Sequence, residues 1–158
     1  MTPERISIRH ARPEEADELR DLAHRSKAHW PYRAEFLEAV RPLLQLSAAD
    51  MRYATVRVLE IDGQRAGWHR VTLHPDRAEL EDLWLEPDWI GQGIGRILFE
   101  DAVAVARQAG AARMEWDAEP FAEGFYRTMG GEEIGRSPSA VDRTRSLPRM
   151  RLELMPLP

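Results

Sequence analysis

The feature that most constrains this chain is a glycine-rich turn between an apolar segment and an amphipathic one. Residues 80–89 read LEDLWLEPDW, and the turn Gly91-x-Gly93-x-Gly95 follows almost at once. Apolar residues then recur at helical spacing to about residue 108. Glycine lets the backbone approach a ligand closely, and the first N–H groups of a helix have no partner within the helix. The stretch therefore predicts a strand, a turn and a helix that together form an anion site.

Two common nucleotide-binding loops do not match this turn. The dinucleotide fingerprint needs a third glycine where this chain has Arg96, and the phosphate loop of nucleotide hydrolases needs a Gly-Lys-Ser/Thr triplet that the chain lacks. Taken alone, the turn also fits an ordinary connection between a strand and a helix.

Composition excludes several classes of protein. A length of 158 residues predicts one domain, residues 1–158. A net charge of −5 argues against nucleic acid as the main partner. The chain has no cysteine, which excludes thiol nucleophiles and fits the cytoplasm. No apolar run approaches the ~20 residues of a membrane span, and the first residues lack a signal-peptide core.

Apolar periodicity and turn residues predict an alternation of strands and helices. The expected strands are residues 6–9, 53–61, 66–73, 78–85, 113–117, 132–136 and 150–155. The expected helices are residues 13 to about 27, a second stretch with apolar residues from Phe36 to Leu43 that Pro42 should kink or end early, residues 93–108 and residues 121–129. A polar loop is expected at residues 137–147.

The spacing from Gly91 to Gly95 resembles the pyrophosphate loop of the GNAT superfamily, the GCN5-related N-acetyltransferases, although Ile90 stands where that family prefers a basic or amide residue. Residues 117–130, DAEPFAEGFYRTMG, resemble a second motif of the family, with Phe121 in place of an asparagine and Gly131 in place of a phenylalanine. The order β-α-α-β-β-β-α-β-α-β also matches, so the resemblance covers essentially the whole chain.

The resemblance implies an α/β (α+β) fold with a central, mixed, mostly antiparallel sheet flanked by helices. In that fold two parallel strands splay apart and hold acetyl-CoA between them. The resemblance assigns the cofactor to backbone donors of the strand before the loop, to N–H groups of the loop and to one residue of the second motif. These residues are Leu83, Trp84, Leu85, Gly91, Gln92, Gly93, Ile94, Gly95, Arg96 and Phe121.

Acetyl transfer to an amine needs a way to remove a proton from the amine, and three strand carboxylates are candidates. Strand alternation puts Glu79 and Glu81 on one face and Asp82 on the other. Glu79 matches the position where several family members keep a glutamate that acts as base, often through water. A carboxylate is a weak base at neutral pH unless burial raises its pKa. Solvated acids with no chemical role, or a water chain with no single base, remain alternatives.

Tyr126 matches the family's tyrosine near the acetyl-CoA sulfur, and a phenol can donate a proton to a departing thiolate. The alternative is an aromatic residue packed in the core beside Phe125. By the same resemblance, the loop after the first helix walls the acceptor pocket, and its aromatic and hydrogen-bonding residues are candidate substrate contacts. These are His29, Trp30, Tyr32 and Arg33. The alternative is a loop whose aromatic rings only anchor it to the domain.

No pair among the five histidines has the helical i, i+4 spacing of a zinc site, and the chain lacks the Gly-x-Ser-x-Gly turn of serine hydrolases, so we expect neither a metal nor serine hydrolysis. The sequence thus predicts a cytoplasmic, acetyl-CoA-dependent N-acetyltransferase that acts on a primary amine of a small molecule or a protein. O-acyl transfer and an acyl-CoA-binding regulatory module with weak or no catalysis remain alternatives. We expect no nucleic acid or membrane partner, and a homodimer is left open.

Overall fold

Within residues 5–154, which the computed structural model describes, seven strands form one sheet in the order β1-β2-β3-β4-β5-β7-β6. Neighbouring strands are antiparallel except for β4 and β5, which are parallel. The strands are β1 (Ile6–His10), β2 (Thr55–Ile61), β3 (Gln64–Leu73), β4 (Ala78–Leu85), β5 (Arg113–Asp117), β6 (Glu132–Pro138) and β7 (Ser146–Glu153). This mixed, mostly antiparallel sheet confirms the fold class predicted from the sequence.

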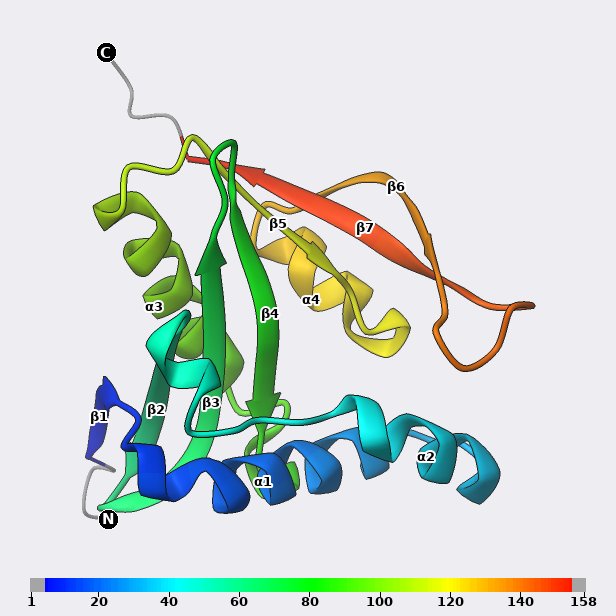
Figure 1. Cartoon of the computed structure of the whole chain (residues 1–158), viewed down its shortest axis with the longest axis horizontal. Coiled ribbons are helices and arrows are strands. Elements are labelled where there is room, and N and C mark those ends of the chain that lie inside the picture. The colour runs from blue at the N-terminus through cyan, green and yellow to red at the C-terminus, as the bar shows by residue number, and fades with distance from the viewer. Residues whose placement is uncertain (1–4, 155–158) are drawn as a thin grey trace.

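Helices cover both faces of the sheet (Figure 1). On one face lies α1 (Ala16–Ala28), with α2 (Ala34–Val40) beyond its end, and on the other lie α3 (Ile94–Gln108) and α4 (Glu123–Thr128). Leu19 of α1 packs in a core with Trp68 of β3, and Phe99 of α3 packs with Trp116 of β5. No helix among residues 5–154 is long and apolar enough to cross a membrane.

Local sequence signals account for most of the boundaries. Pro42 ends the second helical stretch as predicted, because α2 stops at Val40 and gives way to a 3₁₀ turn at Arg41–Leu43. Gly110, just past α3, has a φ of 82°, which fits a glycine at the end of a helix. Asp62 and Gly63 both have positive φ and connect β2 to β3 in a tight hairpin.

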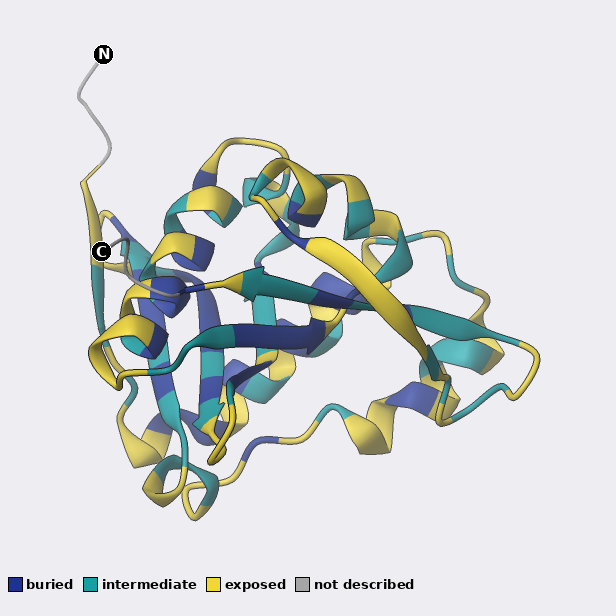
Figure 2. Ribbon diagram, turned by 90° about the horizontal axis from the view of Figure 1, so that it is seen from above, coloured by how far each residue is buried: buried dark blue, intermediate teal, exposed yellow. Residues whose placement is uncertain are grey.

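The last two strands extend further into the expected polar loop than their apolar pattern predicted. Ser137 pairs with Leu147 and Pro138 pairs with Ser146, so β6 and β7 continue as a long hairpin. β6 lies at the edge of the sheet and is mostly exposed (Figure 2), and such a strand carries little apolar alternation. Residue 155, the predicted end of the last strand, lies outside the described residues.

The two parallel strands separate soon after they meet. Their register contains two residue pairs, Ala78 with Met114 and Glu79 with Glu115, although β4 continues to Leu85. Beyond Glu79 the edge of β4 that faces β5 is therefore free of strand partners. This confirms the predicted pair of splayed parallel strands.

A β-bulge in β4 corrects one expectation about side-chain direction. Leu80 pairs with Val71 of β3, whereas Asp82 pairs with the adjacent Arg70, so Glu81 is an extra residue. The bulge resets the alternation and places Asp82 on the same face as Glu79, not on the opposite face. Strict two-residue alternation could not reveal an inserted residue.

Candidate active site

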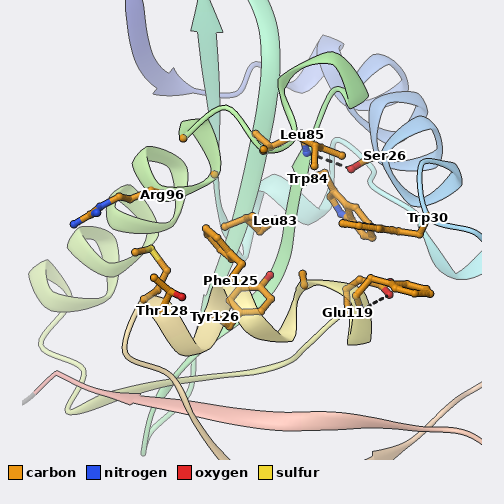
Figure 3. A pocket seen from close by; sticks show the side chains of 17 residues that line it. Ser26, Trp30, Leu83, Trp84, Leu85, Arg96, Glu119, Phe125, Tyr126 and Thr128 are labelled. Atoms are coloured by element: carbon orange, nitrogen blue, oxygen red, sulfur yellow. Dashed lines mark hydrogen bonds between the residues drawn. The ribbon is translucent and has the colours of Figure 1, made fainter.

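A cavity of about 380 Å³ opens where β4 and β5 part (Figure 3). It is lined by the end of β4, the glycine loop, the start of α3, the loop before α4 and α4 itself. Ten of the residues predicted from the sequence line it: Trp30, Leu83, Trp84, Leu85, Gly91, Gly93, Gly95, Arg96, Phe121 and Tyr126. Seven others do not: His29, Tyr32, Arg33, Glu79, Glu81, Gln92 and Ile94.

The glycine loop turns its backbone toward open space. Gly91 has a φ of 81° and Gly93 a φ of 84°, conformations that other residues rarely adopt. A Cβ atom built on either glycine would have no neighbour within 4 Å. No side chain caps the start of α3, so its first N–H groups remain open to an anion. Ile94 is buried in the core and can offer only its backbone.

The end of β4 presents backbone donors to the gap between the strands. The N–H of Leu85 donates to the hydroxyl of Ser26 on α1 at 3.3 Å. Leu83 lies two residues earlier, so its N–H points to the same edge of the strand. The Leu85 N–H is therefore already hydrogen-bonded to Ser26, and the Leu83 N–H is the donor directed at the gap between the strands.

Tyr126 comes from α4 and its hydroxyl points into the cavity, toward β4 (Figure 3). Its ring packs against Phe99, Trp116 and Phe125, with centroids 5.2–5.9 Å apart. Burial raises the pKa of Tyr126 well above its ordinary value, and the negative charge of Glu119 acts in the same direction. The phenol is therefore protonated at neutral pH and can act as a proton donor.

Aromatic residues close one end of the cavity. The rings of Trp30 and Phe121 stack with centroids 5.6 Å apart and planes 11° apart, and both residues line the cavity. Tyr32 contacts Phe121 edge to face at 5.4 Å. This stack joins the loop after α1 to the loop before α4. His29 and Arg33 are exposed on the same loop, and His29 contacts Trp30 edge to face at 4.8 Å.

Sequence reasoning missed Glu119, which lines the cavity beside this aromatic wall. Its carboxylate accepts hydrogen bonds from the Lys27 ammonium and the Tyr32 hydroxyl. Burial and the Glu119 hydrogen bond raise the pKa of Tyr32 to about 12, so Tyr32 stays a donor. The available signal was an acidic residue next to Pro120 within the second motif. Its partner Lys27 lies 92 positions away in the sequence, which no local pattern can show.

The carboxylates of β4 lie outside the cavity lining. Glu79 accepts two hydrogen bonds of 2.6 Å from Arg149 and one of 3.1 Å from Arg77. Glu81 is exposed at the bulge and accepts a hydrogen bond of 2.8 Å from Thr72. Neither carboxylate lines the cavity into which the Tyr126 hydroxyl points. The role of either one as the base stays a prediction.

Asp82 is a third acid of the same strand, and its side chain is 9% exposed. Burial raises its pKa, while Arg70 and the indole N–H of Trp84, at 2.6 and 2.9 Å, oppose that effect. Through this bond Asp82 fixes the ring of Trp84, which lines the cavity.

Comparison with known proteins places these features in context. Residues 16–130 match the model of the acetyltransferase (GNAT) family. The peptidyl-lysine N-acetyltransferase YjaB of Escherichia coli is 30% identical over 142 residues, which cover 84% of this chain and 86% of that protein. An aminoglycoside N(6′)-acetyltransferase of Stenotrophomonas maltophilia is 29% identical over 119 residues, or 68% and 75% of the two chains.

A third relative, from Bacillus subtilis, is provisionally named an alanine N-acetyltransferase of ribosomal protein bS18. It is 30% identical over 86 residues, and the match spans 52% of this chain but only 57% of that protein. Among solved structures, the PaiA N-acetyltransferase of Thermoplasma acidophilum, determined with coenzyme A, has a TM-score of 0.76. The two chains are 18% identical, and the alignment covers 94% of this chain and 99% of that one.

Proposed function

Because this chain belongs to the acetyltransferase (GNAT) family, we propose that it is an acetyl-CoA-dependent N-acetyltransferase that moves an acetyl group directly to a primary amine. The main support for this proposal is that one cavity contains both an anion site and a proton donor. The uncapped start of α3 and the hydroxyl of Tyr126 both lie in its wall. An anion site and a proton donor within one apolar cavity are what binding and cleaving an acyl thioester require.

The residues present fit acetyl-CoA. Gly91 and Gly93 leave open space in front of their backbone, where a pyrophosphate would meet the first N–H groups of α3. The N–H of Leu83 is directed at the gap between β4 and β5, where it can bind the amide groups of the pantetheine arm. Arg96, at the start of α3, adds a positive charge at the rim. Acetyl-CoA supplies the acetyl group as a thioester.

Tyr126 is the proposed proton donor. A new C–N bond forms between the amine and the acetyl carbon as the C–S bond breaks, and the sulfur takes a proton from the Tyr126 hydroxyl. The surplus proton on nitrogen leaves to solvent, and Tyr126 is reprotonated from solvent, so protons balance. The proposed transfer does not depend on Glu79 or Glu81, because neither lines the cavity; the role of either as a base acting through water stays a prediction from the sequence.

The acceptor is proposed to enter beside Trp30 and Phe121, where the loop after α1 meets the loop before α4. The named acceptors of the relatives are a peptide lysine, a protein alanine and an aminoglycoside, and all of them carry a primary amine. The acceptor of this chain is accordingly proposed to be a primary amine of a small molecule or a protein. A homodimer stays a prediction.

Two of the three departures from family preference, at Gly131 and Phe121, do not favour a module without catalysis. At Gly131, a Cβ atom would lie 2.9 Å from the Trp116 ring, so this core has no room for the larger residue that the family prefers. Phe121, in place of an asparagine, is half of the aromatic wall.

The test is release of free coenzyme A from acetyl-CoA in the presence of four amines: a peptide that begins with alanine, a peptide that contains lysine, kanamycin and benzylamine. Amine-dependent release, with the acetylated amine found by mass spectrometry, is the expected result. Tight binding of acetyl-CoA with no turnover on any amine would favour a regulatory module. Ester products from hydroxyl compounds would favour O-acyl transfer.

A further inference from the structure

Glu119 is the one carboxylate among the described residues that line the cavity. The other lining residue with a formal charge is Arg96, next to the glycine loop. Tyr126 shares the cavity with Glu119, and its hydroxyl points into the same space (Figure 3). An amine that enters this cavity therefore meets a single anionic side chain, close to the proposed proton donor.

The protein holds this carboxylate in place but leaves part of it unused. The Lys27 ammonium donates to Oε2, and the Tyr32 hydroxyl and the Phe121 N–H, the latter at 3.3 Å, donate to Oε1. A carboxylate offers about four lone-pair positions, so three donors leave one for a ligand. The Glu119 side chain is 12% exposed, so few water molecules compete for that position.

The charged groups around Glu119 leave a small positive excess. Lys27 from α1 neutralises the carboxylate and also lies 4.7 Å from the centroid of the Tyr32 ring. Arg145, from the hairpin between β6 and β7, donates to the Tyr32 hydroxyl at 3.5 Å. Tyr126 from α4 is uncharged, and Asp82 from β4 is paired with Arg70. A second cation placed here would donate a hydrogen bond to Glu119 and meet repulsion from Lys27.

We propose that Glu119 accepts a hydrogen bond from the amino group of the acceptor and that Lys27, beside it, favours the uncharged form of that amine. This inference rests on the proposed N-acetyltransferase activity. A like charge and a dry surrounding both disfavour an ammonium ion. The acceptor ammonium loses its proton to solvent as it enters, and its nitrogen lone pair becomes free to form the C–N bond.

The arrangement also indicates a substrate class. The stacked rings of Trp30 and Phe121 line the cavity next to Glu119, so they cover the carbon chain that carries the amine. The fitting acceptor is a primary aliphatic amine with an apolar stem. Because the amine is already uncharged when it reaches the thioester, no strong base is needed to remove a proton from it. The cavity therefore needs no second carboxylate for that purpose.

The test is the pH dependence of kcat, which reports the ionisation of the bound amine. The acceptor is whichever of the four amines the wild-type protein turns over fastest. Glu119→Gln removes a negative charge, so the apparent pKa should fall. The acceptor KM should rise by about 10-fold, which corresponds to the free energy of one hydrogen bond to a charged group. The acetyl-CoA KM should stay unchanged.

Lys27→Gln removes the positive charge but keeps a donor for Glu119, so the apparent pKa should rise by about one unit and kcat at neutral pH should fall. Lys27→Arg keeps the positive charge, so its apparent pKa should stay at the wild-type value whatever its absolute rate. Glu123→Gln is the matched control, because Glu123 begins α4 four residues after Glu119, pairs with Arg127 and does not line the cavity. Melting curves of each variant establish that it is folded.

Shifts in opposite directions for the two variants support the inference, because loss of structure alone would not produce them. Shifts in the same direction, or an unshifted profile of Lys27→Gln, overturn it. If Glu119→Gln turns over too slowly for a profile, the profile of Lys27→Gln decides alone. A wild-type protein that releases no coenzyme A with any amine would instead overturn the proposed function.

Discussion

Arg149 on β7 donates both terminal nitrogens to the carboxylate of Glu79 on β4, with each N–O distance 2.6 Å. Glu79 lies directly across from Glu115 of β5, at the last residue pair before the two strands part. Arg149 also reaches Glu115 at 3.1 Å. One guanidinium therefore bridges two adjacent carboxylates at the point where the cavity opens, and it offsets their mutual repulsion.

This position of Glu79 leads to the first prediction. Glu79→Gln should lower the free energy of unfolding by about 1.5 kcal/mol, the low end for hydrogen bonds to charged groups, because solvent partly screens the pair. Because Arg149 and Arg77 already occupy the carboxylate, kcat should stay within about threefold of the wild-type value. Urea unfolding and steady-state kinetics give the two quantities. A fall in kcat of about 10²-fold with unchanged stability would show that Glu79 is the base.

The second prediction concerns the acceptor wall. Trp30→Ala removes the ring that stacks on Phe121. The acceptor KM should rise by roughly 3-fold to 10-fold, which corresponds to the free energy of one aromatic contact. The acetyl-CoA KM should change much less. Tyr53→Ala, at a tyrosine that is 82% exposed and away from the cavity, is the control. Equal rises in both constants would mean that Trp30 only anchors its loop.

The third prediction concerns the leaving group. Tyr126→Phe keeps the packed ring and removes the hydroxyl that points into the cavity, so kcat should fall by roughly 10²-fold to 10³-fold with acetyl-CoA affinity nearly intact. A melting curve should show little loss of stability. Since burial raises the pKa of Tyr126, wild-type kcat should not decline from phenol ionisation below about pH 10. Unchanged kcat in the variant would remove Tyr126 from the mechanism.

The fourth prediction concerns acid stability. The Glu15 carboxylate accepts hydrogen bonds from the Arg9 side chain and also from the Arg12 N–H and the Arg65 side chain. These bonds lower the pKa of Glu15 to about 2, although burial alone would raise it. A depressed pKa contributes stability above the unfolded value, about 4.5, and this contribution is lost as the pH falls toward 2. Glu15→Gln should therefore cost about 2–3 kcal/mol at pH 7 and flatten the loss of stability below pH 4.5. Urea unfolding from pH 7 to 3 measures both.

Glu14→Gln is the matched control for this measurement, because Glu14 is the exposed neighbour of Glu15 in the 3₁₀ turn just before α1. It should leave both the stability at pH 7 and its acid dependence near the wild-type values. If Glu15→Gln behaved like this control, the ion cluster that joins β1, β3 and α1 would contribute nothing to the fold.

Local chemistry made much of the fold predictable. The run from β4 through Gly93 into α3 was placed within one residue, because apolar spacing, proline and glycine each act over a few neighbouring positions. Trp30 and Tyr126 were expected at the cavity from a family resemblance, and both line it. Their roles in binding and catalysis stay predictions.

The missed features depend on distant partners or on irregular backbone. The bulge at Glu81 changes which face Asp82 occupies, and no residue in the sequence marks it. Glu119 is held by an ion pair with Lys27, which is 92 positions away. Glu79 is held by an ion pair with Arg149, which is 70 positions away. Such contacts are set by the order of strands in the sheet, which local patterns do not encode.

The central claim is that acetyl-CoA binds with its pyrophosphate at the glycine loop, and calorimetric titration of acetyl-CoA into Gly93 variants tests it most directly. Asn and Asp both tolerate the left-handed backbone of Gly93 better than other residues, and they have nearly the same shape, so the pair isolates the effect of charge. Gly93→Asp should bind acetyl-CoA at least about 10-fold more weakly than Gly93→Asn, because a carboxylate would face the pyrophosphate. Equal affinities in the two folded variants would contradict this placement of the cofactor.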